Sequence, residues 1–168
     1  MKKIIITGGA GFIGCNLAKK LVKTNKIMIL DKLSSSSNIN NIKTILKNKN
    51  CCFKKIDICN YSKVKKVFYQ FKPNYIFNLA AESHVDKSID NASQFIRTNI
   101  FGVYNLLRIC DEYYKTNCKK NERFIFHQIS TDEVFGDLPK KSKIKFSESH
   151  KYNPSSPYSA TKASSDHL

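Results

Sequence analysis

The residues with the clearest chemical potential lie near the carboxyl end of the sequence. Tyr158 and Lys162 are four residues apart, so on a helix they would lie on the same face. A lysine ammonium beside a phenol favours the phenolate, which brings the tyrosine into range as a base. Ser130 and Thr131 could hydrogen-bond the same substrate oxygen. A Tyr–Lys pair at this spacing also arises by chance on exposed helices, so its meaning depends on the rest of the chain.

The adjacent acids Asp132 and Glu133 follow Ser130 and Thr131 directly. One carboxyl group could donate a proton while the other accepts one, which requires different environments for their two pKa values. Consecutive acids at the end of a strand are more often helix caps or surface residues, and that alternative stays open.

A glycine-rich turn near the amino terminus supplies the context for these side chains. The apolar run of residues 4–7 leads into Gly8, Gly9, Gly11 and Gly14. Such glycines let the backbone approach a pyrophosphate, and the following helix directs unpaired N–H groups and its dipole at that anion. The spacing fits both the dinucleotide fingerprint and the related pattern of short-chain dehydrogenases.

An acidic residue ends the next apolar run, at Asp31, about 20 residues beyond the fingerprint. A carboxylate there can accept both hydroxyls of the adenosine ribose and would repel a 2′-phosphate, so NAD is favoured over NADP. The neighbouring Lys32 keeps this preference open, and a structural strand–turn–helix without any ligand is the alternative.

Strand and helix patterns alternate along the chain. We expect strands over residues 4–7, 27–31, 51–58, 75–79 and 124–129, and helices over 12–24, 42–46, 61–71 and 92–114. A further helix should begin at Pro157. This rhythm predicts an α/β fold, a Rossmann-type doubly wound parallel sheet with helices on both faces.

Several polar residues are expected where these strands end. Asp57 and Ile58 are candidates for contact with an adenine, although Asp57 could equally cap the helix that starts at Tyr61. Residues 34–41 suit either a loop beside the adenosine or an idle linker, and residues 80–88 should form a loop over the cofactor. Within that loop, His84 is either a solvated surface residue or a substrate contact.

The composition suits one domain of 168 residues and 19.2 kDa with a real core. The net charge of +16 comes almost entirely from lysine, with arginine only at 97, 108 and 123, and no nucleic-acid motif accompanies it. We interpret the excess as compositional drift that attracts an anionic nucleotide as a by-product, without a specific nucleic-acid partner.

Segment lengths and cysteine spacing bear on location and metals. The sequence contains no run of eighteen apolar residues, so it predicts no membrane span. The first apolar run is too short for a signal peptide, and we therefore expect a cytoplasmic protein. The six cysteines lack C-x-x-C spacing, which predicts reduced thiols and no metal site.

Taken together, these residues resemble the amino-terminal half of the extended short-chain dehydrogenase/reductases and, more narrowly, the dTDP-glucose 4,6-dehydratases. The resemblance runs through the motifs TGGAGFIG, NLAAESHVDKSI, STDEVFG and YNPSSPYSATKASSDHL, and it covers essentially the whole chain. Sugar-nucleotide epimerases share the glycine-rich motif and the Tyr–Lys pair, but they lack the acidic pair after the threonine.

The resemblance implies NAD-dependent dehydration of dTDP-glucose to dTDP-4-keto-6-deoxyglucose. Tyr158, with Lys162 and Thr131, would take the proton of the sugar 4-hydroxyl while C4 is oxidised. Glu133 would remove the C5 proton and Asp132 would protonate the departing 6-hydroxyl, before hydride returns to C6. The alternatives are an inactive NAD-binding remnant and another nucleotide-sugar epimerase or dehydratase of the same family.

The resemblance also implies binding positions. Those expected to hold NAD are Gly8, Gly11, Phe12, Ile13, Gly14, Asp31, Lys32, Leu33, Ser34, Asp57, Ile58, Leu79, Ala80, Ala81, Glu82, Ser83, Thr98, Tyr158 and Lys162. Those expected to contact the substrate are Ser83, His84 and Thr131.

The family continues for roughly as many residues again, forming a smaller substrate lobe, and its full-length members are often homodimers. We therefore expect residues 1–168 to form one NAD-binding domain that ends within the helix carrying Tyr158 and Lys162, with the substrate lobe absent.

Overall fold

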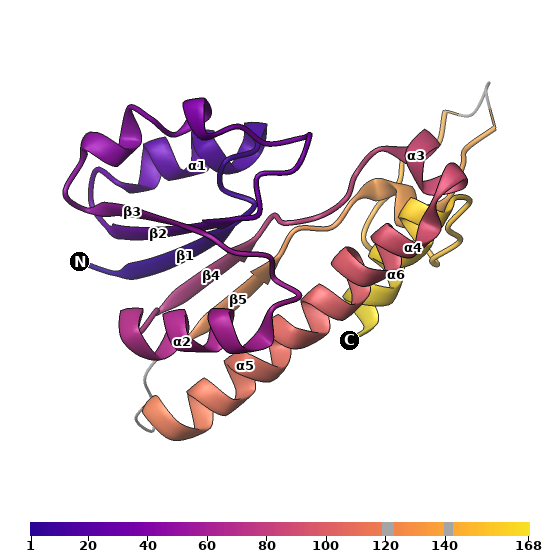
Figure 1. Cartoon of the computed structure of the whole chain (residues 1–168). Coiled ribbons are helices and arrows are strands. Elements are labelled where there is room, and N and C mark those ends of the chain that lie inside the picture. The colour runs from indigo at the N-terminus through magenta and orange to yellow at the C-terminus, as the bar shows by residue number, and fades with distance from the viewer. Residues whose placement is uncertain (119–122, 140–142) are drawn as a thin grey trace. The chain divides into compact units, whose positions relative to one another are not determined.

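The computed structural model describes residues 1–118, 123–139 and 143–168 (Figure 1). The chain forms two compact units, each of which is described by itself. Unit 1 comprises Met1–Ala80 and Gly102–Ile129, and unit 2 comprises Ala81–Phe101 and Ser130–Leu168. Within the described ranges, no helix has the length and apolar character needed to cross a membrane.

Unit 1 is built on a five-stranded parallel sheet in the order β3-β2-β1-β4-β5. The central strand β1 pairs with β2 and β4, so Ile5 lies opposite Met28 on one side and Ile76 on the other. The predicted Rossmann-type sheet is confirmed. Its strands are β1 (Lys3–Thr7), β2 (Lys26–Asp31), β3 (Cys51–Lys55), β4 (Tyr75–Asn78) and β5 (Ile125–Gln128).

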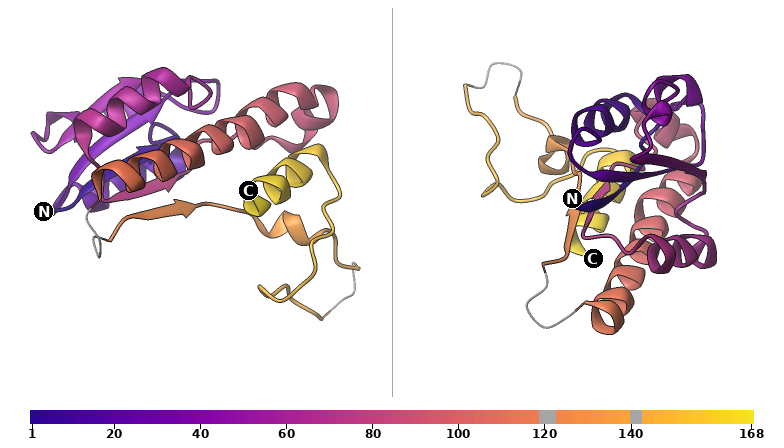
Figure 2. Two further views of the ribbon diagram at one scale, coloured as in Figure 1. Left: turned by 90° about the horizontal axis from the view of Figure 1, so that it is seen from below. Right: turned by 90° about the vertical axis from the view of Figure 1, so that its left-hand side faces the viewer.

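Helices cover both faces of this sheet because alternate strand residues point to opposite sides. On one face, Ile4 and Ile6 pack with the apolar residues of α1 (Phe12–Leu21). On the other, Ile5 lies in a cluster with residues from α2 (Tyr61–Phe71) and α5 (Gly102–Asn117). Figures 1 and 2 show α1 on one side of the sheet and the adjacent α2 and α5 on the other.

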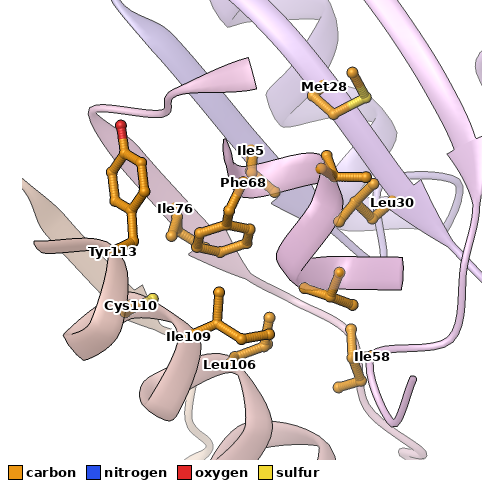
Figure 3. Close-up of a cluster of buried hydrophobic side chains, with 12 residues drawn as sticks. Ile5, Met28, Leu30, Ile58, Phe68, Ile76, Leu106, Ile109, Cys110 and Tyr113 are labelled. Carbon is orange, nitrogen blue, oxygen red and sulfur yellow. The ribbon is translucent and has the colours of Figure 1, made fainter. Parts of the chain in front are cut away.

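The cluster beneath α2 and α5 is the larger of the two cores. Phe68 of α2 points toward Ile76 of β4 and toward Leu106 and Ile109 of α5 (Figure 3). All four side chains are fully buried. The helix predicted over residues 61–71 is therefore confirmed, and Phe68 lies on the face that α2 packs on the sheet.

Three sequence-based boundaries in unit 1 require correction. The first helix ends at Leu21 rather than at residue 24. The strand predicted over 51–58 ends at Lys55, and it is not buried throughout: as an edge strand it hides Cys51 but exposes Cys52. The short helix predicted over 42–46 is replaced by two 3₁₀ turns, η1 (Ile39–Asn41) and η2 (Ile45–Lys47).

Unit 2 contains short helices packed around α6 (Pro157–His167). Pro157 is the first helical residue, as predicted, and Ser156 and Ser159 form a reciprocal capping box with both N···O distances at 3.0 Å. The other elements are α3 (Val85–Asp90), α4 (Ala92–Phe95), η3 (Ile96–Phe101) and η4 (Asp132–Phe135).

Two predictions in unit 2 are wrong. The loop expected over 80–88 becomes helical at Val85, where α3 begins. The single helix expected over 92–114 is divided, because η3 (Ile96–Phe101) is a π-helical stretch between α4 and α5. Such stretches are rare inside helices and often accompany functional sites.

The net positive charge is concentrated in unit 1. Lys and Arg equal Asp and Glu in number within the residues of unit 2, so unit 1 accounts for the whole +16. The unit that contains the glycine-rich turn is therefore the strongly basic one, which favours approach of an anionic ligand to it.

Replacement of Phe68 by alanine tests the core beneath α2 and α5. We expect Phe68→Ala to lower the free energy of unfolding by about 3–5 kcal/mol, because it removes a large buried side chain and leaves a cavity. Gln70→Ala, at an exposed position of the same helix, should change it by less than about 0.5 kcal/mol. Denaturant titration measures both, and equal effects would contradict this packing.

Candidate functional site

The residues that unit 1 contributes to the candidate site meet at one edge of its sheet. The strands are parallel, so their carboxyl ends lie together. Gly8 follows β1, Asp31 ends β2, Asp57 follows β3, and Leu79 follows β4. The predicted cofactor positions of this unit are thus brought to the edge where doubly wound folds bind nucleotides.

The glycine-rich turn is held by backbone contacts that leave no space for side chains. Gly8 has a φ of +65°, and a Cβ there would lie 2.7 Å from the backbone nitrogen of Ala80. A Cβ on Gly14 would lie 2.4 Å from the carbonyl oxygen of Gly8. These two positions require glycine, so the sequence motif reflects a steric constraint.

The amino terminus of α1 suits an anion. Its N-cap residue, Gly11, makes no side-chain cap hydrogen bond, and the first turn contains no acidic residue. Phe12 and Ile13 are 81% and 64% exposed, so this turn lies at the surface. Backbone N–H groups and the helix dipole there fit a pyrophosphate.

Asp31 ties the glycine-rich turn to the segment that follows β2. The side chain is 6% exposed, and its oxygens accept hydrogen bonds from Ala10 N at 3.0 Å, Leu33 N at 2.7 Å and Ser37 Oγ at 2.8 Å. A carboxylate has about four lone-pair sites, so capacity for a further donor remains. Leu33 has a φ of 59°, and the Ser34 hydroxyl lies 3.1 Å from that of Ser36.

The alternative role considered for Asp57 is wrong. The N-cap of α2 is Asn60, whose side chain accepts from Lys63 N at 3.1 Å. Asp57 instead accepts from Cys59 N at 2.8 Å, which shapes the turn after β3. The Ile58 side chain is buried in the core beside Gly102, so only its backbone is available to a ligand.

Unit 2 brings the predicted catalytic residues together. Tyr158 and Lys162 lie on α6 and are 9% and 5% exposed. The Tyr158 hydroxyl forms a hydrogen bond with the Thr131 side chain. Thr131 is also the N-cap of η4, since its Oγ1 accepts from Glu133 N at 3.3 Å. Asp132 and Glu133 are exposed on that turn.

The electrostatics of the pair differ from the sequence-based expectation. Burial raises the pKa of Tyr158, the Thr131 hydrogen bond opposes this, and the nearby charges of Glu133 and Asp132 raise it further. Burial lowers the pKa of Lys162, and the charge of Asp166 opposes that shift. Among this chain's own groups, the causes that raise the pKa of Tyr158 prevail, so a lowered pKa does not follow from the spacing to Lys162 alone.

A buried amide anchors the segment that follows β4 to α6. Asn99 of η3 accepts from Glu82 N at 2.9 Å and donates to Glu82 O and Thr161 Oγ1, each at 3.0 Å. Ser83 and His84, the expected substrate contacts, are exposed beside it. The signal that could have revealed this role is an asparagine on an otherwise apolar helical stripe.

One more buried polar residue supports the same helix. Ser88 of α3 accepts from Tyr158 N at 3.1 Å, and its side chain is fully buried. Thr98, expected to contact the cofactor, is 3% exposed within η3, and Ala81 is half-buried. The part of the chain that the structure describes contains no cluster of three or more His, Cys, Asp or Glu side chains suited to a metal ion.

The parallel sheet, the glycine-only turn and the helix bearing Tyr158 and Lys162 define a Rossmann-type fold of the short-chain dehydrogenase/reductase class. A family model described as GDP-mannose 4,6 dehydratase matches residues 5–168, and the chain belongs to that family.

Named relatives give further comparisons. The chain is 44% identical over 171 residues to dTDP-glucose 4,6-dehydratase of Neisseria meningitidis, covering 100% of this chain and 48% of that protein. The crystal structure of the Bacillus anthracis dTDP-glucose 4,6-dehydratase in complex with NAD is similar with a TM-score of 0.83, 36% identity and coverage of 99% and 49%. The Streptomyces venezuelae dTDP-glucose 4,6-dehydratase with NAD and TYD bound has a TM-score of 0.87, 30% identity and coverage of 98% and 49%.

A UDP-glucose 4-epimerase is also similar in structure. The Thermus thermophilus enzyme in complex with NAD has a TM-score of 0.80, 25% identity and coverage of 98% and 49%. The chain thus spans about half the length of the relatives it matches.

The raised pKa of Tyr158 can be tested by removing one of its causes. Glu133→Gln should lower the pKa of Tyr158, because a nearby negative charge that opposes the phenolate is lost. Titration of the Tyr158 Cζ signal by ¹³C NMR measures this. The matched change Glu148→Gln, at an exposed position of the same unit, should leave it unaltered. An unchanged or higher pKa in Glu133→Gln would contradict the geometry.

The anchoring role of Asn99 has a matched test. Asn99→Leu should lower the free energy of unfolding by about 2 kcal/mol or more, since the backbone N–H of Glu82 and the hydroxyl of Thr161 each lose their hydrogen bond to the buried amide. Gln94→Leu also removes a hydrogen bond to Glu82, but an exposed one, and should cost less than about 0.5 kcal/mol. Equal costs in denaturant titration would show that Asn99 is not a buried anchor.

Proposed function

We propose that this chain carries the NAD site and the catalytic residues of an NAD-dependent dTDP-glucose 4,6-dehydratase. The observation that carries the proposal is the position of Asp132 and Glu133, on the turn capped by Thr131, which itself hydrogen-bonds to the Tyr158 hydroxyl. A dehydration needs an acid and a base besides the Tyr–Lys pair, and this turn provides two carboxyl groups beside it. The relatives named dTDP-glucose 4,6-dehydratase support the same assignment.

The chain's own residues fit NAD. The glycine turn and the uncapped start of α1 would bind its pyrophosphate, and Asp31 would accept the ribose hydroxyls. The backbone after β3 and β4, at Asp57 and Leu79, lies at the same sheet edge and would line the adenine and ribose. When bound, NAD supplies a hydride acceptor for C4, a hydride donor for C6 and a positive charge that favours the phenolate.

The proton transfers would fall to unit 2. Tyr158 would accept the proton of the sugar 4-hydroxyl, with Lys162 stabilising the phenolate and Thr131 donating to the same oxygen. The 4-ketone acidifies the C5–H bond, and Glu133 would remove that proton. Asp132 would then protonate the departing 6-hydroxyl, so that water leaves across C5–C6, and Glu133 would return a proton to C5 when hydride reaches C6. Ser83 and His84 would contact the sugar from the anchored segment.

A second candidate function is 4-epimerisation of a nucleotide sugar. The glycine-rich turn, the Tyr–Lys pair and the likeness to a UDP-glucose 4-epimerase are compatible with it. That reaction removes and returns hydride at C4 and requires no base at C5. The acidic pair on η4 therefore favours the dehydratase.

Deuterium exchange at C5 separates these functions. In the protein isolated from its native source, supplied with dTDP-glucose in D₂O, Glu133→Gln should abolish exchange at C5. Reduction of bound NAD, which reports C4 oxidation, should remain measurable because the Tyr–Lys pair is intact. NMR of the sugar and absorbance of the cofactor measure the two steps. The control Glu148→Gln should retain both C5 exchange and reduction of bound NAD. Unaltered C5 exchange in Glu133→Gln would contradict the assignment of Glu133 as the base.

A further inference from the structure

Asp166 lies one turn beyond Lys162 on α6 and contacts two other segments of unit 2, one at Ser130 and the other at Tyr152. Its Oδ2 accepts a hydrogen bond from the Ser130 hydroxyl and another from Tyr152 Oη at 3.2 Å. Ser130 immediately precedes Thr131, and Tyr152 lies in the segment that leads into α6. Asp166 thus joins three stretches of chain at one carboxylate.

The segment that Asp166 contacts at Ser130 also carries the proposed acid and base, Asp132 and Glu133. Tyr152 packs edge-on against Phe135 of η4, with ring centroids 5.4 Å apart. Its ring also packs at a tilt against the ring of His167, with centroids 4.9 Å apart. Asp166 therefore holds both ends of the stretch from Ser130 to Phe135, one end directly and the other through Tyr152. Thr131 lies within this stretch and reaches Tyr158 on the same helix.

We propose that Asp166 is a positioning residue, which fastens the Ser130–Phe135 stretch to α6 and places a negative charge on the helix face of the buried Lys162. Lys162 and Asp166 are separated by four residues and so lie on one face of the helix. A buried ammonium loses hydration, and a nearby carboxylate offsets that cost. The inference rests on the proposed function only for the roles of Lys162 and Thr131.

The charge of Asp166 acts on Lys162 in the direction that this role requires. Burial lowers the pKa of Lys162 and Asp166 raises it, while burial and Asp166 together raise the pKa of Tyr152. Besides Tyr158 and His167 on α6 itself, the titratable and charged residues on the elements packed against α6 are Asp132 and Glu133 of η4, Arg97 of η3, and Asp86, Lys87 and Asp90 of α3.

The decisive variant is Asp166→Asn, read by NMR titration of the Lys162 Nζ, with the signal assigned by its loss in Lys162→Met. The pKa of Lys162 should fall further, because the offsetting charge is lost while burial persists. A residue that merely supports the fold would give the opposite result, since loosened packing hydrates the ammonium and raises its pKa. Asp166→Glu should restore the original pKa, and Asp137→Asn, an exposed carboxylate of the same unit, should not alter it.

Ser130→Ala tests the fastening of the Ser130–Phe135 stretch separately, because it removes the hydrogen bond to Asp166 and keeps the charge of Asp166. Hydrogen exchange of the Glu133 amide, which bonds to Thr131, should become about fivefold faster, the factor expected from one lost hydrogen bond. Ser164→Ala, an exposed serine on the same helix, should leave that amide unchanged.

The inference is overturned if the pKa of Lys162 stays the same or rises in Asp166→Asn, or if Ser130→Ala leaves exchange at Glu133 unaltered. Neither measurement needs NAD or substrate. The inference can therefore fail in a protein that forms the dehydration product, and it can hold in one that does not.

Discussion

The proposed cofactor site depends on the close backbone approaches at Gly8 and Gly14. One brings the turn after β1 against the segment after β4, and the other brings the start of α1 against the turn itself. Any side chain at either position would push these backbones apart. The proposed pyrophosphate site therefore follows from backbone packing, and Asp31 holds the resulting turn with its carboxylate.

The positions of the proposed catalytic residues depend instead on buried polar contacts around one short helix. Asn99, Ser88 and Thr131 each fix α6 or its neighbours through side-chain hydrogen bonds. Polar groups at these positions cost free energy unless they are paired, so each pair specifies one arrangement. The π-helical turn of η3 is what places Asn99 against both Glu82 and Thr161.

The sheet was predictable from the sequence because its signal is local. The apolar runs that end at Thr7, Asp31 and Asn78 are short, nearly uniform and separated by helical patterns, which is typical of buried parallel strands. The prediction for β3 extended beyond its observed end at Lys55, because the burial of a strand depends on having a neighbouring strand on both sides and β3 has one on a single side.

Other features were not readable from local patterns. The π-helical stretch of η3 was not predicted, so the contacts of Asn99 could not be placed from a regular helical pattern over residues 92–114. The pKa of Tyr158 depends on burial and on Glu133, which is distant in sequence, so the spacing to Lys162 alone does not determine it. The contact between Ser130 and Asp166 likewise requires tertiary structure.

The proposed dehydratase activity depends on the acidic pair beside the Tyr–Lys helix. The most direct measurement is the product formed from dTDP-glucose and NAD by the protein isolated from its native source, identified by mass and NMR. The proposed function predicts loss of one water and a 4-keto-6-deoxy sugar, with NAD regenerated. A product of unchanged mass that is inverted at C4, or bound NAD with no sugar product, would contradict it.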